Sequence, residues 1–357
     1  MPREIKIAAI QMDASPAAPD ERLERAERLV VEAAGAGARL VVLPELFNTG
    51  YTYAESNYRR AERPDGPTAA WMRVTASRLG VHLAGSLMLV DQDEVYNALL
   101  LYAPDGRVWR YDKLYPWGWE RAYFRQGRGI TVAETDLGRI GMLVCWDAAH
   151  PGLWKRYAGR VDLMLISSCP PDVSDPTYHF PNGDQLTIKQ LGPVMASIED
   201  MGRAVFGDMI NEQTAWLGVP AVNTVGTGQL RLKVLHGMVL TLCLLPQAPW
   251  LIRWLPQSDR LTMACDLVPG CKIVDATGQP LVELTQEQGE GFALAEVSLA
   301  EVRPTPGGPQ PPSRVPLAAY VLSDGVLPAV CRSDYRRGLR RTRGRDAAPV
   351  DAATRRR

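Results

Sequence analysis

Histidine and paired cysteines are scarce in this sequence, which limits the chemistry that it can support. The 357 residues contain four scattered histidines and six cysteines. The cysteines form no CxxC pair and no Cys–His spacing typical of metal sites. A metal site or a Ser-His-Asp triad is therefore difficult to assemble, and we expect no metal and no cofactor.

Long apolar segments and a secretion signal are also missing. An apolar stretch at 234–245 has only about a dozen residues, whereas a membrane-spanning helix takes about 20. Without a leader, the cysteines are expected to be reduced thiols in a cytoplasm.

Net charge is zero, but it is unevenly distributed. Residues 332–357 contain ten Arg and three Asp, a net charge of +7, so the remainder carries −7. An acidic body argues against nucleic acid as the main partner. The apolar fraction of 46% is that of an ordinary globular protein, and the length permits about two domains at roughly 150 residues each.

One cysteine follows a strand-like run. Residues 140–144 are continuously apolar, Cys145 ends the run, and a helical pattern then leads to a second apolar run at 161–166. A lone cysteine is usually a small buried apolar residue. At the carboxyl end of a buried strand, however, a thiol is placed where α/β folds bind ligands, and it can attack an electrophilic carbon if a base takes its proton.

Two further stretches supply partners for such a thiol. Glu45 follows the apolar run 40–43, and its apolar neighbours would raise its pKa toward that of a general base. Lys113 follows the strand pattern 108–111 inside an aromatic cluster, where a fixed positive charge could face an oxyanion. Glu120 comes seven residues later. Solvated surface charges are the alternative interpretation of both groups.

Taken together, these stretches resemble the signature of the nitrilase superfamily of carbon–nitrogen hydrolases. Glu45 matches the base of that family, Lys113 its lysine, Cys145 the nucleophile of its Cys-Trp/Tyr-Asp/Glu pattern, and Glu120 its second glutamate. The resemblance implies an α/β fold, a four-layer αββα sandwich, and at least a homodimer. The turn after the cysteine departs from the family pattern, because Ala149 stands where an Arg is frequent.

The resemblance also implies a reaction, the hydrolysis of a non-peptide C–N bond through a cysteine thioester. Trp146, Tyr51 and Trp119 are the expected oxyanion or substrate contacts, in pocket walls formed by 48–58, 115–125, 170–185 and an insertion. Asp147 after the Cys-Trp pair favours an amidase, with a nitrilase as the alternative. A non-catalytic binding protein and an acyl-transferring, membrane-associated enzyme remain as further hypotheses.

The expected organisation is a hydrolase domain over 1–302, a proline-rich extension over 303–331 and a basic disordered tail over 332–357. The insertion, 229–269, interrupts the family pattern. It is expected to be a lid or a buried oligomer contact. Peripheral membrane contact through 229–257 is the alternative, because Trp and Arg of the kind found at lipid headgroups occur there.

Overall fold

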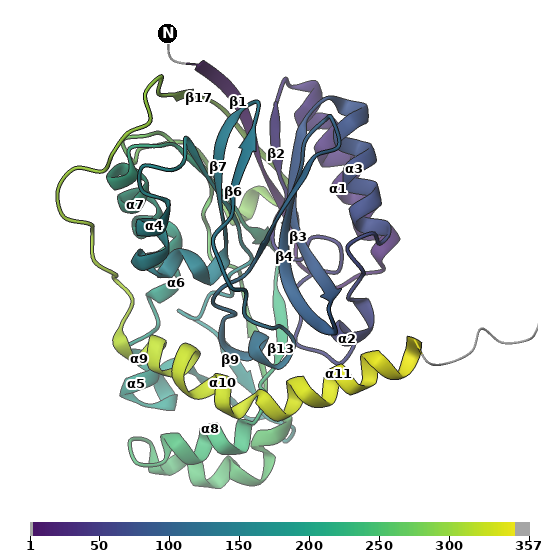
Figure 1. The fold of residues 1–357 in the computed structure, drawn as a ribbon. Helices are drawn as coiled ribbons and strands as arrows, with labels where there is room; N and C mark the ends of the chain where they lie inside the picture. Colours follow the sequence, from purple (N-terminus) through teal and green to yellow (C-terminus); the bar gives the residue numbers. More distant parts are fainter. Residues whose placement is uncertain (1–2, 347–357) are drawn as a thin grey trace, which may run out of the picture.

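The computed structural model describes residues 3–346, which form two β-sheets packed face to face with helices on both outer faces. Figure 1 shows the resulting order of layers, with α1 and α3 outside one sheet and α4 and α7 outside the other. The predicted four-layer αββα sandwich is confirmed.

The first sheet has seven strands in the order β12-β1-β2-β3-β4-β5, with β17 also paired to β1. The central strands β1, β2 and β3 are parallel to one another, so their carboxyl ends lie at one edge. The bounds are β1 (Arg3–Asp13), β2 (Leu40–Val42), β3 (His82–Asp91), β4 (Glu94–Tyr102), β5 (Val108–Asp112), β12 (Gly226–Thr227) and β17 (Gly291–Leu299).

The second sheet has six strands in the order β16-β15-β11-β8-β7-β6, and its central strands β7, β8 and β11 are parallel. Their residues are buried from both sides, which explains the continuous apolar runs in the sequence. The bounds are β6 (Val132–Thr135), β7 (Gly138–Val144), β8 (Leu163–Ser167), β11 (Ala221–Thr224), β15 (Cys271–Val274) and β16 (Pro280–Leu284).

The outer helices bury one apolar face each. On the first sheet these are α1 (Pro19–Gly35) and α3 (Pro67–Leu79), and on the second α4 (Pro151–Tyr157) and α7 (Ile210–Leu217). Shorter helical segments occur in the connections: α2 (Asn57–Arg60), η1 (Gly118–Ala122), η2 (Cys145–Ala149), η3 (Ile188–Leu191), α5 (Pro193–Ala196), α6 (Met201–Arg203), η4 (Ala204–Met209) and η6 (Gln286–Gln288).

The insertion does not stand alone. Its strands β13 (Leu230–Lys233) and β14 (Thr262–Cys265) join β9 (Thr177–His179) and β10 (Gln185–Thr187) in a small four-stranded sheet. Part of 170–185, which the sequence analysis gave as a pocket wall, is thus strand, because β14 supplies the ladder partner for β9. Between β13 and β14 lie α8 (Gly237–Leu244) and the 3-10 helix η5 (Pro249–Arg260). None of the helices within residues 3–346 has the length and apolarity that crossing a bilayer requires.

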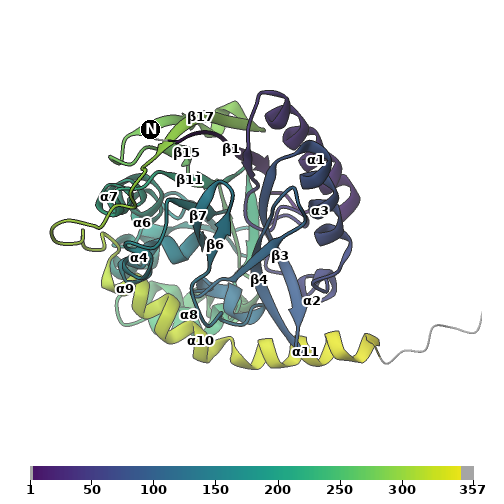
Figure 2. The same cartoon turned by 45° about the horizontal axis from the view of Figure 1, so that its top comes forward.

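The C-terminal residues differ from the sequence prediction. After an irregular proline-rich segment come α9 (Leu317–Tyr320), the π-helical η7 (Val321–Val326), α10 (Leu327–Val330) and α11 (Arg332–Asp346). Figure 1 and Figure 2 both show these helices crossing from the side of α4 to that of α2. The disordered tail predicted over 332–357 is therefore wrong for 332–346; residues 347–357 lie outside the described part. The basic composition hid the packing of α11, in which Tyr335 is buried and its hydroxyl bonds the Glu94 carboxylate.

Candidate active site

The three predicted catalytic side chains lie at strand ends of two different sheets. Glu45 follows β2 and Lys113 follows β5, both in the first sheet, whereas Cys145 follows β7 in the second. Because the sheets pack face to face, residues 45, 113 and 145 meet between them, and all three side chains are buried.

Lys113 connects two carboxylates. Its Nζ lies 2.7 Å from Oε1 of Glu45 and 2.7 Å from Oε2 of Glu120. Burial acts to lower the pKa of Lys113, but the charges of Glu120, Glu45 and Cys145 outweigh it and hold that pKa well above its ordinary value. The ammonium group therefore stays charged and fixed in position.

The backbone is strained at Cys145 and next to Glu45. Cys145 has φ +50°, in the left-handed region that favours glycine, and so does Leu46, with φ +52°, directly after Glu45. Such strain is kept where the surrounding structure over-determines the conformation, and it is concentrated at functional sites. At Cys145 it turns the chain sharply at the end of β7.

Burial dominates the electrostatics of the acid and the thiol. It raises the pKa of Glu45 to about 7 against the opposing charge of Lys113, the direction that its apolar neighbours predicted. Burial and the charge of Glu45 also raise the pKa of Cys145 well above its ordinary value, and Lys113 offsets only part of that rise. The resting thiol is therefore protonated, and its proton has to pass to a base as it attacks.

Two groups orient the Glu45 carboxylate, and the sequence analysis did not identify them. The Asn97 side chain on β4 donates a hydrogen bond of 2.7 Å to Oε1, and the backbone N–H of Cys169 donates one of 3.0 Å to Oε2. The Ser86 hydroxyl in turn donates to the Asn97 carbonyl. A sequence signal did exist, because Asn97 is an amide inside the otherwise apolar run of β4.

Asp147 ties the lysine and cysteine loops together. Its Oδ1 accepts the backbone N–H of Tyr115 at 2.8 Å and its Oδ2 accepts the Tyr111 hydroxyl at 2.7 Å. Burial raises the pKa of Asp147, whereas Lys113 and these hydrogen bonds act in the opposite direction. Asp147, which the sequence analysis used to choose between amide and nitrile substrates, therefore also links the loops that carry Lys113 and Cys145.

The three predicted contact residues have different surroundings. The Tyr51 hydroxyl donates to Oε1 of Glu120 at 2.6 Å, so it positions the second carboxylate. Trp119 turns toward the insertion, where its indole N–H donates to the Leu235 carbonyl at 3.0 Å. Trp146 is buried, and its indole N–H has no hydrogen-bond partner within residues 3–346.

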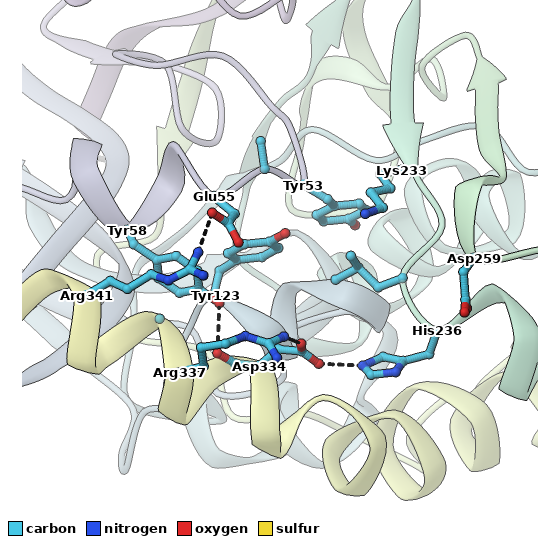
Figure 3. Close-up of a pocket in the computed structure, with 13 residues that line it drawn as sticks. Tyr53, Glu55, Tyr58, Tyr123, Lys233, His236, Asp259, Asp334, Arg337 and Arg341 are labelled. Carbon is cyan, nitrogen blue, oxygen red and sulfur yellow. Dashed lines mark hydrogen bonds and ion pairs between the residues drawn. The ribbon is translucent and has the colours of Figure 1, made fainter.

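An outer pocket of about 320 Å³ lies beyond the aromatic side chains next to Glu120. Figure 3 shows Tyr53 and Tyr123 at its inner wall, Lys233 and His236 of the insertion on one side, and α11 on the other. The Tyr53 hydroxyl is 3.0 Å from that of Tyr51. The pocket thus connects with the catalytic cluster through two tyrosines.

Side chains of the insertion and of 53–58 hold α11 over this pocket. Asp334 pairs with His236, and Arg341 pairs with Glu55. The Tyr58 hydroxyl contacts the Asp334 carbonyl at 3.2 Å. The C-terminal helix is therefore part of the wall of the outer pocket.

The C-terminal extension also contacts the loops that carry Cys145 and Glu120. The Ser323 hydroxyl accepts the backbone N–H of Gly118 at 3.1 Å, and Asp324 lies 3.0 Å from Arg121. On the other loop, the Tyr320 hydroxyl donates to the carbonyl of Ala149. This is the turn where the sequence departs from the family pattern, and this chain fills it with its own C-terminal residues.

No group of three or more His, Cys, Asp or Glu side chains within residues 3–346 is arranged to hold a metal ion. All six thiols are free; five are buried, and Cys243 on α8 is exposed.

Sequence comparison relates this chain to a known family. The profile of the carbon-nitrogen hydrolase family matches residues 6–188, just over half of the chain, a range that contains all four predicted catalytic residues. A nitrilase of Pyrococcus abyssi is 32% identical over 151 residues, which cover 41% of this chain and 58% of the relative. The omega-amidase NIT2 of Danio rerio is 31% identical over 173 residues, 45% of this chain and 61% of the relative. The chain thus spans about six-tenths of the length of these curated relatives.

Solved structures share the fold. A mutant of the amidase from Nesterenkonia AN1 aligns with a TM-score of 0.58 at 21% identity, over 83% of this chain and 92% of that one. A CN-hydrolase superfamily protein from Xanthomonas campestris aligns with a TM-score of 0.57 at 21% identity, over 84% of this chain and 91% of that one.

Proposed function

The chain belongs to the carbon-nitrogen hydrolase family, and on that premise we propose that it hydrolyses amides to an acid and ammonia or an amine. The observation that carries the proposal is the burial of Cys145, Glu45 and Lys113 in one cluster, with Lys113 Nζ 2.7 Å from Oε1 of Glu45. Stable packing of the two sheets does not require charged side chains from their strand ends to be buried together.

In the first half of the reaction, Glu45 takes the proton of the Cys145 thiol as the sulfur attacks the carbonyl carbon. A C–S bond forms and the carbonyl oxygen becomes negative. Lys113 and the backbone N–H of Trp146, at the start of η2, stabilise this oxygen. One such donor contributes about 3–4 kcal/mol. Glu45 then protonates the nitrogen, the C–N bond breaks and a thioester remains.

In the second half, Glu45 removes a proton from water, which attacks the thioester. The second tetrahedral intermediate collapses, the acid leaves, and the sulfur recovers its proton from Glu45. Glu120, supported by Tyr51, keeps Lys113 in position in both halves. A pKa of about 7 suits Glu45 to both giving and taking the proton near neutrality.

A nitrile substrate is the second candidate, because a relative with 32% identity is named a nitrilase. The same thiol would add to the nitrile carbon, and water would complete the release of ammonia. The amide is preferred because Asp147 follows the Cys-Trp pair, as in many amidases of the superfamily that the sequence resembles.

The test compares wild type, Cys145→Ala and Cys271→Ala on matched panels of small amides and nitriles, with acid and ammonia as the products measured. We expect turnover by wild type and by Cys271→Ala, whose thiol is buried on β15 away from the site, and none by Cys145→Ala. Turnover of nitriles alone would reverse the preference, and activity that survives in Cys145→Ala would reject covalent catalysis at this residue. An added amine acceptor that appears in the product would indicate acyl transfer instead of hydrolysis.

A further inference from the structure

An apolar cavity of about 110 Å³ lies between the insertion and the C-terminal extension. A smaller hollow of about 50 Å³ adjoins it. The two spaces share five lining residues: Trp119, Tyr178, Met195, Leu322 and Leu327. We call the pair the apolar chamber.

Three polar groups of the chamber wall are engaged elsewhere. The indole N–H of Trp119 donates to the Leu235 carbonyl, and that of Trp254 donates to Asp184 at 2.6 Å. The Thr241 hydroxyl donates to Ser258 at 2.9 Å. Most of the remaining lining is aliphatic or aromatic, which favours a hydrocarbon occupant.

The chamber is lined by the residues that directly precede Glu120. Trp117, Gly118 and Trp119 line it, and the next residue, Glu120, bonds the Lys113 ammonium group. Adjacent Cα atoms are about 3.8 Å apart. On the other side, the Trp117 ring lies 6.5 Å from the ring of Trp146, which follows Cys145.

Most of the wall lies outside the family match at 6–188. The larger cavity is lined chiefly by α8, η5 and the helices after residue 317, together with Trp119, Tyr178 and Phe180 from within that range. The chemistry of the lining therefore indicates what the chamber binds.

We propose that the apolar chamber binds the hydrocarbon substituent of the substrate, so that the enzyme prefers amides or nitriles with an extended alkyl or aryl group. The reaction in this inference is the one given as the proposed function, so that part rests on the proposed function. The class of ligand rests on the lining of the chamber alone.

Helix α8 offers a matched pair of positions for a test. Leu240 faces inward and lines the chamber, whereas its neighbour Val239 is 42% exposed and does not. Leu240→Trp would fill the chamber, and Val239→Trp adds the same side chain outside it.

The first measurement is kcat/KM for straight-chain primary amides from propanamide to octanamide. We expect a rise of about fourfold for each methylene that enters the chamber. Leu240→Trp should flatten this dependence, Val239→Trp should retain it, and Leu240→Ala should shift the preferred chain to a greater length. Turnover of short amides with no dependence on chain length would overturn the inference and leave the proposed function standing.

The second measurement needs no turnover. In the Cys145→Ala background, calorimetry should show tighter binding of octanamide than of propanamide, with the difference removed by Leu240→Trp and kept by Val239→Trp. If wild type hydrolyses no amide or nitrile while the binding differences are still found, that result would reject the proposed function but support a hydrocarbon ligand in the chamber. Equal binding of both amides, or equal loss in both Trp variants, would reject the chamber as the binding site.

Discussion

His150 and Asp324 lie 3.0 Å apart, Nε2 to Oδ2, and they join the loop after Cys145 to the C-terminal extension. His150 also stacks on Tyr115 of the lysine loop, with ring centroids 3.6 Å apart. Asp324 therefore contacts the loop after Cys145 directly and, through His150, the loop that carries Lys113.

Removing the charge of Asp324 should loosen these loops. Burial acts to raise the pKa of Asp324, but the hydrogen bond and charge of His150, together with Arg121, hold it below its ordinary value. We expect Asp324→Asn to lower the free energy of unfolding by about 1–3 kcal/mol and to reduce kcat. Asp324→Glu should restore part of both.

The pH dependence of the free energy of unfolding provides a second test of the role of Asp324. Because its pKa is depressed on folding, its stabilising contribution is complete above the ordinary value of 3.8 and is lost as pH falls through the folded-state value. In chemical unfolding of wild type and Asp324→Asn between pH 6 and pH 3, the difference in the free energy of unfolding should therefore narrow as the pH falls below about 3.8. A constant difference across this range would contradict the assignment.

The pH–rate profile should report Glu45. Since the base has to be ionised and its pKa is raised to about 7, kcat/KM should fall about tenfold per pH unit below that point. Glu45→Gln should remove this limb together with nearly all activity. A profile that stays flat down to pH 5 would show that another group accepts the thiol proton.

Tyr51 should act on the reaction through Glu120. Tyr51→Phe removes the 2.6 Å hydrogen bond to the Glu120 carboxylate, which leaves Lys113 less firmly held. We expect kcat to fall by about fivefold to tenfold with a smaller change in KM. Tyr53→Phe, which removes a hydroxyl one hydrogen bond farther away, serves as the control and should have a weaker effect.

Gly338 should be intolerant of any side chain. A Cβ at this position would lie 2.0 Å from ring atoms of Tyr58, whereas one at Gly325 would meet nothing within 4 Å. Gly338→Ala should lower the free energy of unfolding by about 1–3 kcal/mol, although alanine favours helix. Gly325→Ala should be neutral or stabilising. Thermal unfolding of both variants tests the docking of α11.

The three predicted catalytic residues could be identified from the sequence because each lies at or just after the end of a strand-like stretch. Strand ends are marked by local pattern, so residues 45, 113 and 145 could be identified without knowing which strands pair. Their convergence depends on how the two sheets pack, which no local sequence pattern indicates. The expectation that the three residues meet came from the family resemblance.

Contacts between residues distant in sequence could not be predicted from local sequence patterns. Nothing near Asp324 indicates that it meets His150, 174 residues away. The arginines of α11 suggested a solvated tail, although Tyr335 buries its ring on the body. The peripheral membrane contact and the homodimer stay predictions, which vesicle sedimentation and analytical ultracentrifugation can test.

The distribution of thiols gives experimental access to the insertion. Cys243 is exposed on α8 while the other five cysteines, the predicted nucleophile included, are buried. A maleimide dye at limiting concentration should thus label one position at the rim of the apolar chamber. If the chamber binds substrate as proposed, fluorescence from that single label should change when an amide is added, while the buried sulfur of Cys145 stays unmodified.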